Sequence, residues 1–174
     1  MEYEAKEPLW LEKDLLMKFI GDIPILCVGY DLALRVGEVR YLTKAGFNPA
    51  TGDIEVKRLK HKGRRNTYIL TLSDWCLDIL NEYLEALPVE FDTMFPMSVS
   101  TIQNLFNERT ASLGLEGYTF HSLRHSRVTH IVLAELDEKG VVDELSLSKF
   151  AGHLRIETTR MYVHLATRHL AFKT

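Results

Sequence analysis

The sequence is poor in cysteine and contains no long apolar run. Its two cysteines, Cys27 and Cys76, cannot build a disulfide framework or a Cys-based zinc site, and they fit a reducing, intracellular compartment. Residues 1–7 are acidic and lack the basic-then-apolar pattern of a signal peptide. Even the apolar stretch 23–34 is interrupted by a proline and an aspartate, so no segment is predicted to span a bilayer. These absences argue against a disulfide-rich secreted protein and against a membrane-spanning one.

The composition is that of an ordinary globular protein. The chain has 174 residues, of which 46% are hydrophobic and 26% are charged, which is typical of a soluble, folded protein. That length is sufficient to bury a sizeable core. We therefore expect residues 1–174 to form a single domain.

The charge is unevenly distributed. A formal net charge of −3 argues weakly against a nucleic-acid partner, but residues 57–65 contain six basic residues and no acid. This concentrated basic segment favours a surface that binds phosphates, because the local field matters more than the total charge. Solvated charges that protect an exposed strand edge are the alternative interpretation. The six residues are Lys57, Arg58, Lys60, Lys62, Arg64 and Arg65.

The spacing of apolar residues predicts an α+β fold, mainly α-helical with a small three-stranded antiparallel sheet. Thr119 is expected to cap one helix, Ser100 and Gln103 to form a capping box for another, and Gly152 to end a third. Helices are expected over residues 8–19, 25–42, 74–84, 101–113, 119–136, 145–151 and from 158 onward, and strands over 45–47, 54–59 and 67–72. The basic segment then lies at the tip and flanks of a hairpin.

Two short segments suggest a site for an anion. His121 and Arg124 lie three residues apart at an expected helix start, where they share one face beside the partly positive helix end. A bound phosphate suits that position, although the same residues also occur in ordinary amphipathic helices. Arg35 lies among apolar residues of another expected helix and needs an anionic partner, which is either Glu38 or a ligand.

Six polar residues along the chain make up a set with a definite chemistry. Breaking and rejoining a phosphodiester without metal or cofactor needs a nucleophile, cations for the phosphate oxygens and a proton donor for the leaving oxygen. The planar guanidinium of arginine donates paired hydrogen bonds to phosphate oxygens, histidine transfers protons near neutral pH, and a tyrosine hydroxyl can attack the phosphorus. The set comprises Arg35, Lys60, His121, Arg124, His153 and Tyr162.

In these positions the chain resembles the catalytic domain of tyrosine recombinases, the phage-integrase and Xer-like site-specific recombinases. Residues 33–38 (Ala-Leu-Arg-Val-Gly-Glu) are similar to the first-arginine motif of that family, and 121–125 (His-Ser-Leu-Arg-His) to its His-x-x-Arg box. Residues 151–153 (Ala-Gly-His) and 158–164 (Thr-Thr-Arg-Met-Tyr-Val-His) resemble the last two motifs, at the usual nine-residue step from His153 to Tyr162. Lys60 lies where the family has its lysine.

The resemblance implies cleavage and rejoining of DNA through a 3′-phosphotyrosine, with no metal and no ATP. It implies that Arg35 and Arg124 clamp the scissile phosphate, that His153 contacts it, and that Tyr162 is the nucleophile. Glu38 is expected to support Arg35. Lys60 is implied to be the general acid, in competition with Lys57 and Lys62, and His121 the general base.

Partners and setting follow from the same resemblance. It implies double-stranded DNA at a specific recombination site and a homotetramer on that DNA, with a monomer allowed for the isolated domain. It implies an intracellular setting, the cytoplasm or nucleoid of a prokaryotic or virus-infected cell. Ala33 and Ala151 depart from the common glycine and leucine, and the N-terminal core-binding domain of the family is expected to be absent from this chain.

Three other functions remain as alternatives. A non-catalytic DNA-binding module of recombinase descent would have lost one of the six residues, and all six are present. A His-ligated metallohydrolase is suggested by His121 and His125, four residues apart, but no glutamate follows His121 as in a His-Glu-x-x-His zinc motif. A type IB topoisomerase shares the chemistry but needs further clamp domains. His125 and His130 are expected to be packing or surface residues.

Overall fold

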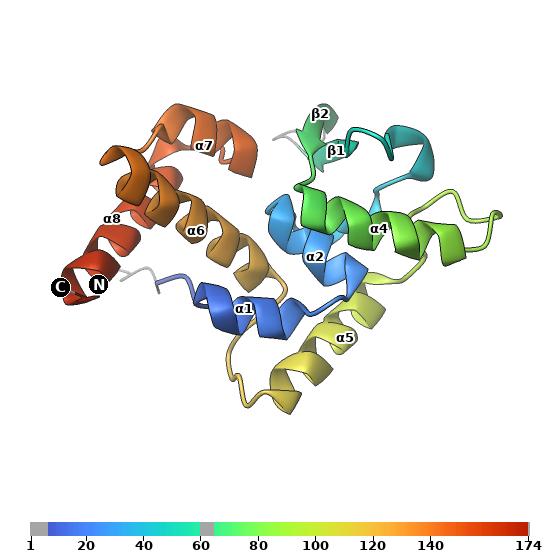
Figure 1. Cartoon of the computed structure of the whole chain (residues 1–174), viewed down its shortest axis with the longest axis horizontal. Coiled ribbons are helices and arrows are strands. Elements are labelled where there is room, and N and C mark those ends of the chain that lie inside the picture. The colour runs from blue at the N-terminus through green and yellow to red at the C-terminus, as the bar shows by residue number, and fades with distance from the viewer. Residues whose placement is uncertain (1–6, 60–64, 174) are drawn as a thin grey trace.

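The chain is mainly helical, with a small hairpin at one edge, in the computed structural model, which describes residues 7–59 and 65–173 (Figure 1). In chain order the elements are α1 (Lys13–Ile20), α2 (Pro24–Asp31), α3 (Val36–Arg40), the 3-10 helix η1 (Lys44–Gly46), β1 (Asp53–Leu59), β2 (Arg65–Thr71), α4 (Asp74–Ala86), α5 (Val99–Ser112), α6 (His121–Lys139), α7 (Glu144–Ala151) and α8 (Ile156–Lys173). Within the described ranges, no helix is long and apolar enough to cross a membrane.

The predicted fold class is confirmed, but the prediction of a third strand is wrong. β1 and β2 form an antiparallel pair in register from Asp53–Thr71 to Leu59–Arg65. The segment expected to form the other strand begins with η1 instead, where Thr43 Oγ1 accepts a hydrogen bond from the Gly46 amide. That turn leaves Phe47 with a single bridge to Ile54.

The expected helix over residues 25–42 is broken at its centre. α2 ends at Asp31, Ala33 adopts a positive φ of 51°, and Arg35 has extended backbone as the residue before α3. Because alanine favours helices, no local sequence pattern predicts this break. The Ala33 carbonyl accepts a hydrogen bond from Arg124 Nη1 at 2.9 Å, a long-range contact that helps to hold the unusual backbone. Arg35 is therefore at a helix start and not inside a helix.

Other helix ends differ from the predictions by a turn or less, except at the start of α1. α1 begins at Lys13, after an irregular segment over residues 7–12 whose Leu11 amide donates to Ser126 of α6, and α6 continues to Lys139 through part of the expected acidic connector. At α5 the cap is Ser98, whose hydroxyl accepts from the Thr101 amide, and not Ser100.

The start of α6 also lacks the expected cap, because the Thr119 side chain does not accept from the helix. The Ser122 hydroxyl instead accepts a hydrogen bond from the Thr119 amide. The predicted end of α7 is confirmed, since Gly152 has the left-handed φ of 66° and its amide bonds the Lys149 carbonyl.

The core has two parts, and α6 contributes to both. The larger one is formed by α1 to α5 and the hairpin, and it includes Leu123 near the start of α6. The smaller one joins α6, α7 and α8 around Val128, Val132 and Leu147, and Tyr162 belongs to it. In Figure 1, α6, α7 and α8 accordingly form the left part of the molecule, while α2, α4 and the hairpin lie in the right part. The predicted site residues come from both sides.

Candidate active site

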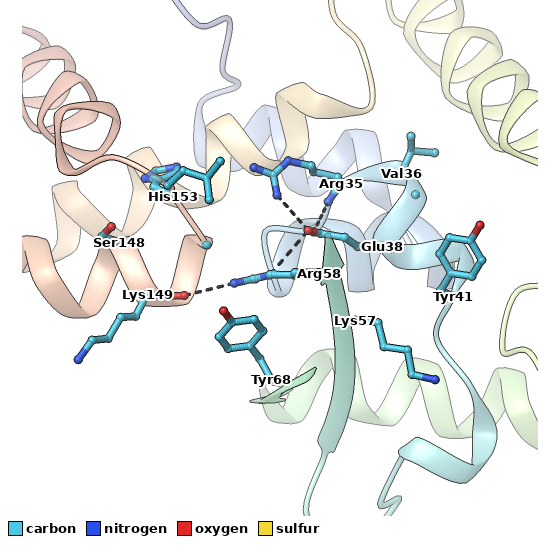
Figure 2. Close-up of a pocket in the computed structure, with 13 residues that line it drawn as sticks. Arg35, Val36, Glu38, Tyr41, Lys57, Arg58, Tyr68, Ser148, Lys149 and His153 are labelled. Atoms are coloured by element: carbon cyan, nitrogen blue, oxygen red, sulfur yellow. Dashed lines mark hydrogen bonds and ion pairs between the residues drawn. The ribbon is translucent and has the colours of Figure 1, made fainter. Parts of the chain in front are cut away.

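A cleft of about 760 Å³ lies between α3 and the hairpin on one side and the end of α7 on the other. In Figure 2, Arg35, Glu38 and Arg58 lie together, and Arg58 reaches toward Lys149 at the end of α7. Its charged and polar lining includes Arg35, Glu38, Lys57, Arg58, Lys149 and His153. Among the described residues that line the cleft, Glu38 is the sole carboxylate, so the cleft carries an excess of positive charge.

Arg35 is held in place by Glu38. The Glu38 carboxylate accepts hydrogen bonds from the Arg35 amide and from Arg35 Nη1, both at 2.9 Å. These two bonds hold the Arg35 backbone and side chain against the first turn of α3. The Arg35 side chain remains 44% exposed, whereas that of Glu38 is 8% exposed. Both sequence interpretations of Arg35 are therefore compatible with this geometry: it pairs with Glu38, and its guanidinium still faces the cleft.

Arg124 is buried, with 1% of the residue exposed. Its Nη1 donates to the Ala33 carbonyl, while Nη2 is buried and has no hydrogen-bond partner. Burial, followed by the positive charge of Arg35, lowers the pKa of Arg124 to about 10, so the guanidinium is still charged at neutral pH. An unpaired donor on a buried cation is costly unless an anion binds there.

His153 also presents a free nitrogen. Its Nδ1 lies 2.8 Å from Thr159 Oγ1 in α8, which fixes the ring, and its Nε2 is buried without a partner. Burial and the positive charges of Arg124 and Arg35 lower the pKa of His153 to about 4. The ring is thus neutral at pH 7, and whether Nε2 carries its proton depends on the tautomer.

Tyr162 lies in the second turn of α8 and is 2% exposed. Its ring stacks on that of His153, with centroids 5.6 Å apart and planes inclined by 4°. Its hydroxyl forms a hydrogen bond with His125 Nδ1. Burial raises the pKa of Tyr162 to about 12, although the charges of Arg124 and Arg35 act in the opposite direction. The phenol is therefore protonated and shielded from solvent in this state.

His125 was expected to be a packing or surface residue, yet it contacts the Tyr162 hydroxyl directly. Burial, with the charges of His121 and Arg124, lowers the pKa of His125 to about 3. The ring of His121 lies edge-on to it, with centroids 4.5 Å apart, and His121 is itself exposed. No pairwise signal in the sequence could identify this contact, because it depends on how α6 packs against α8.

The basic segment is only partly described. Lys60, Lys62 and Arg64 lie outside the described residues, and of Arg65 only the backbone is described. Lys57 is exposed and lines the cleft, as a phosphate-binding residue would. Arg58, also predicted to bind DNA, is instead 3% exposed, and this burial argues against such a contact.

The structure therefore brings together five of the six residues predicted from the sequence: Arg35, His121, Arg124, His153 and Tyr162. His125 joins them, and Glu38 supports Arg35. In the ranges 7–59 and 65–173, no three His, Cys, Asp or Glu side chains are grouped so that they could hold a metal ion. The arrangement can bind an anion between two arginines and His153, next to a tyrosine.

Comparison with known proteins identifies the same kind of domain. The model of the phage integrase family matches residues 15–169. Tyrosine recombinase XerC of Caldanaerobacter subterraneus subsp. tengcongensis is 27% identical over 183 residues, an alignment that covers 92% of this chain and 48% of the relative. The chain thus spans about half the length of the curated relatives it matches.

Solved structures share the fold at lower identity. The crystal structure of XerA recombinase superposes with a TM-score of 0.78 at 22% identity, covering 97% of this chain and 66% of that one. XerH site-specific recombinase, bound to palindromic difH substrate in a post-cleavage complex, superposes with a TM-score of 0.71 at 20% identity, covering 95% and 52%.

Proposed function

Because this chain belongs to the phage integrase family, we propose that it is the catalytic part of a site-specific DNA recombinase that cuts and rejoins strands through Tyr162. The observation that carries this proposal is the pair of buried, unpartnered nitrogens, Arg124 Nη2 and His153 Nε2, beside a buried tyrosine. Buried polar atoms normally have partners, and a phosphodiester oxygen supplies one for each.

The scissile phosphate would lie between the two halves of the molecule. Arg35 reaches it from α3, with its guanidinium oriented by Glu38, and Arg124 reaches it from α6. His153 contributes a further contact from the end of α7. The charges of the two arginines neutralise the negative charge that develops on the non-bridging oxygens, and they do so without reorganisation because the side chains are already fixed.

The reaction is a transesterification. The Tyr162 oxygen attacks phosphorus, a tyrosine–3′-phosphate ester forms, and the bond from phosphorus to the 5′ oxygen breaks. The phenol proton passes to His125, which already contacts that hydroxyl. The 5′ oxygen leaves with a proton that we assign to Lys60. Attack by a 5′ hydroxyl on the ester reverses the step, and the number of phosphate ester bonds is unchanged throughout.

His125 takes the place that the sequence assigned to His121. A neutral His125 with its proton on Nε2 accepts the phenol proton at Nδ1, and the adjacent, exposed His121 can pass a proton on to solvent. Burial lowers the pKa of His125, and a phosphodiester bound between the arginines would raise it by bringing a negative charge nearby. Tyr162, being buried, must move toward the cleft for attack.

The partners of this activity are part of the proposal. XerH was solved with its DNA substrate, and the positive cleft with exposed Lys57 supports double-stranded DNA as the partner of this chain. A homotetramer on DNA, action without metal or ATP, and catalysis by residues 1–174 as one domain remain predictions.

Covalent capture tests the proposal. The chain is incubated at high concentration with a library of duplexes of random sequence, each nicked just downstream of a candidate phosphate so that the short fragment diffuses away. We expect a denaturant-resistant protein–DNA adduct, with the DNA mapped to Tyr162 by mass spectrometry. Tyr162→Phe should form none. An adduct in that variant moves the nucleophile elsewhere, and no adduct from the unmodified chain leaves the non-catalytic DNA-binding module as the better function.

A further inference from the structure

Arg58 lies on the inward face of β1. Side chains alternate along a strand, and Ile54, Val56 and Arg58 share the face that packs on the core, with exposures of 0%, 0% and 3%. The intervening Glu55 and Lys57 are exposed. A guanidinium in an apolar position must be compensated by hydrogen bonds and an anion, so the contacts of Arg58 define what it does.

Those contacts cross the cleft to the end of α7. Arg58 Nη1 donates to the Lys149 carbonyl at 3.2 Å, and Nη2 donates to the Phe150 carbonyl at 2.8 Å. The last carbonyls of a helix have no partners within the helix and form its negative end, so a cation with two donors suits them. Figure 2 shows the Arg58 side chain reaching from the strand to Lys149.

Gly152 fits closely over the same guanidinium. A Cβ at this position would lie 2.5 Å from Arg58 Nη1 and 2.9 Å from Cζ, closer than such atoms approach one another. Gly152 also has the positive φ that ends α7. The backbone at Gly152 therefore lies against the Arg58 guanidinium, one residue before His153. Glycine is needed here because a Cβ would clash with Arg58 and because the backbone has a positive φ.

Arg58 is also tied to the other side of the site. Its Nε lies 3.7 Å from Glu38 Oε1, the oxygen that accepts from Arg35 Nη1. One carboxylate thus connects Arg35, which faces the phosphate position, with Arg58, which holds the end of α7. α7 belongs to the smaller core and β1 to the larger one, so this polar link joins the two halves at the cleft.

We propose that Arg58 is a positioning residue for the phosphate site: by clamping the last turn of α7 to β1 and Glu38, it sets His153 in register with Arg35. The proposal rests on the proposed function, because the site that it positions is the one that binds the scissile phosphate. Arg58 does not contact the phosphate. Its removal should therefore disturb the site through His153, whose Nδ1 remains anchored to Thr159.

A matched control is present in the same chain. Arg109 in α5 donates from Nε to the Phe19 carbonyl at 2.8 Å and from Nη2 to the Lys18 carbonyl at 2.7 Å, next to the positive-φ Gly21 that ends α1. It caps a helix end in the same way, but not at the cleft. Arg109→Met and Arg58→Met each remove two hydrogen bonds to the carbonyls of a helix end. Arg58→Lys keeps the positive charge but lacks the paired N–H donors of the guanidinium.

The first measurement uses inorganic phosphate as the probe. His153 ring nitrogens are observed by NMR in the full chain and assigned with a His153→Gln variant. In the unmodified chain and in Arg109→Met, phosphate should shift the His153 Nε2 resonance. In Arg58→Met the resonance should already differ without phosphate, and the phosphate-induced shift should be lost. Arg58→Lys should restore part of it.

The second measurement is the single-turnover rate of covalent capture on a nicked duplex selected from the library. A small misplacement of a catalytic group costs up to roughly 100-fold, so Arg58→Met should be slower by about that factor at saturating DNA. Arg109→Met should react at the unmodified rate even if it melts earlier. All variants are compared at a temperature where melting curves show each of them folded.

The outcomes separate the two proposals. If the unmodified chain shows neither a phosphate-induced shift at His153 nor an adduct, the proposed function fails and this inference fails with it. If the unmodified chain shows both and folded Arg58→Met matches it in both, Arg58 has no positioning role while the proposed function stands. A rate loss in Arg109→Met as large as in Arg58→Met would reduce the effect to general destabilisation and also overturn the inference.

Discussion

Replacing Glu38 by glutamine tests whether one carboxylate holds the cationic cleft together. Glu38→Gln keeps the size of the side chain and removes its charge. The Glu38 carboxylate accepts two hydrogen bonds from Arg35 and lies at ion-pair distance from the buried Arg58. After the substitution these two guanidiniums face an amide, and Arg58 becomes a buried cation without a countercharge.

The expected cost follows from exposure. The Arg35 guanidinium is 44% exposed, so the loss of its ion pair costs about 1 kcal/mol or less. Arg58 is buried, and removing one partner of a buried ion pair costs about 3–5 kcal/mol, which the 3.7 Å separation and the remaining carbonyl contacts reduce. We expect a total near 3 kcal/mol, which for a domain of this length lowers the Tm by roughly 6–12 °C.

Thermal melting followed by circular dichroism at pH 7 measures this loss. Inorganic phosphate, added at matched ionic strength in place of chloride, should raise the Tm of Glu38→Gln more than that of the unmodified chain, because the anion replaces the missing charge. Glu144→Gln is the control, since its pair with Arg160 is exposed to solvent and the substitution should leave the Tm nearly unchanged. A Glu38→Gln protein that melts within about 2 °C of the unmodified chain would refute the reasoning.

Three further predictions concern acid, capping and metal. Burial is the main cause that lowers the pKa values of His125, His130 and His153 to about 3, 4 and 4, so at acid pH the unfolded chain binds protons that the folded chain does not. The free energy of unfolding should therefore be complete above pH 6.5 and fall progressively toward pH 4. Equilibrium unfolding at several pH values measures this, and a constant free energy of unfolding over that range would contradict the burial of these rings. Ser98→Ala should cost about 1 kcal/mol because the Ser98 hydroxyl caps α5, and Ser100→Ala less, as denaturant titration would measure; the reverse order would favour the capping box predicted from sequence. Chelation with EDTA should leave the rate of covalent capture unchanged, and activity restored by a divalent ion would favour metal-dependent chemistry.

Local sequence patterns predicted much of the fold. The end of α7 at Gly152 follows from glycine's access to positive φ, and the helix and strand periods fix most elements within about a turn. The break at Ala33 could not be predicted in this way, because alanine favours a helix and the Arg124 contact that accompanies the positive φ comes from 91 residues further along the chain. The strand expected over residues 45–47 was likewise replaced by η1, because the Thr43 side chain caps that turn by accepting a hydrogen bond from the Gly46 amide.

For the site, residue types and their order along the chain were sufficient to predict the set Arg35, His121, Arg124, His153 and Tyr162, which the structure brings together. Its catalytic roles remain a proposal. The sequence analysis placed Arg58 in the basic, phosphate-binding segment, and only the structure shows that it is buried beside Ile54 and Val56. What the sequence determined by itself was thus the inventory of chemical groups and most local elements, since both depend on near neighbours.

Only the tertiary structure decided how those groups are used. The packing of α6 against α8 places His125 on the Tyr162 hydroxyl, and the approach of α7 to the hairpin gives Arg58 two helix carbonyls as hydrogen-bond partners. Each contact joins residues far apart in the chain, and the rotation of one element against another selects which of several similar side chains meets its partner. That rotation is set by the two packed cores, and no local pattern in the sequence specifies it.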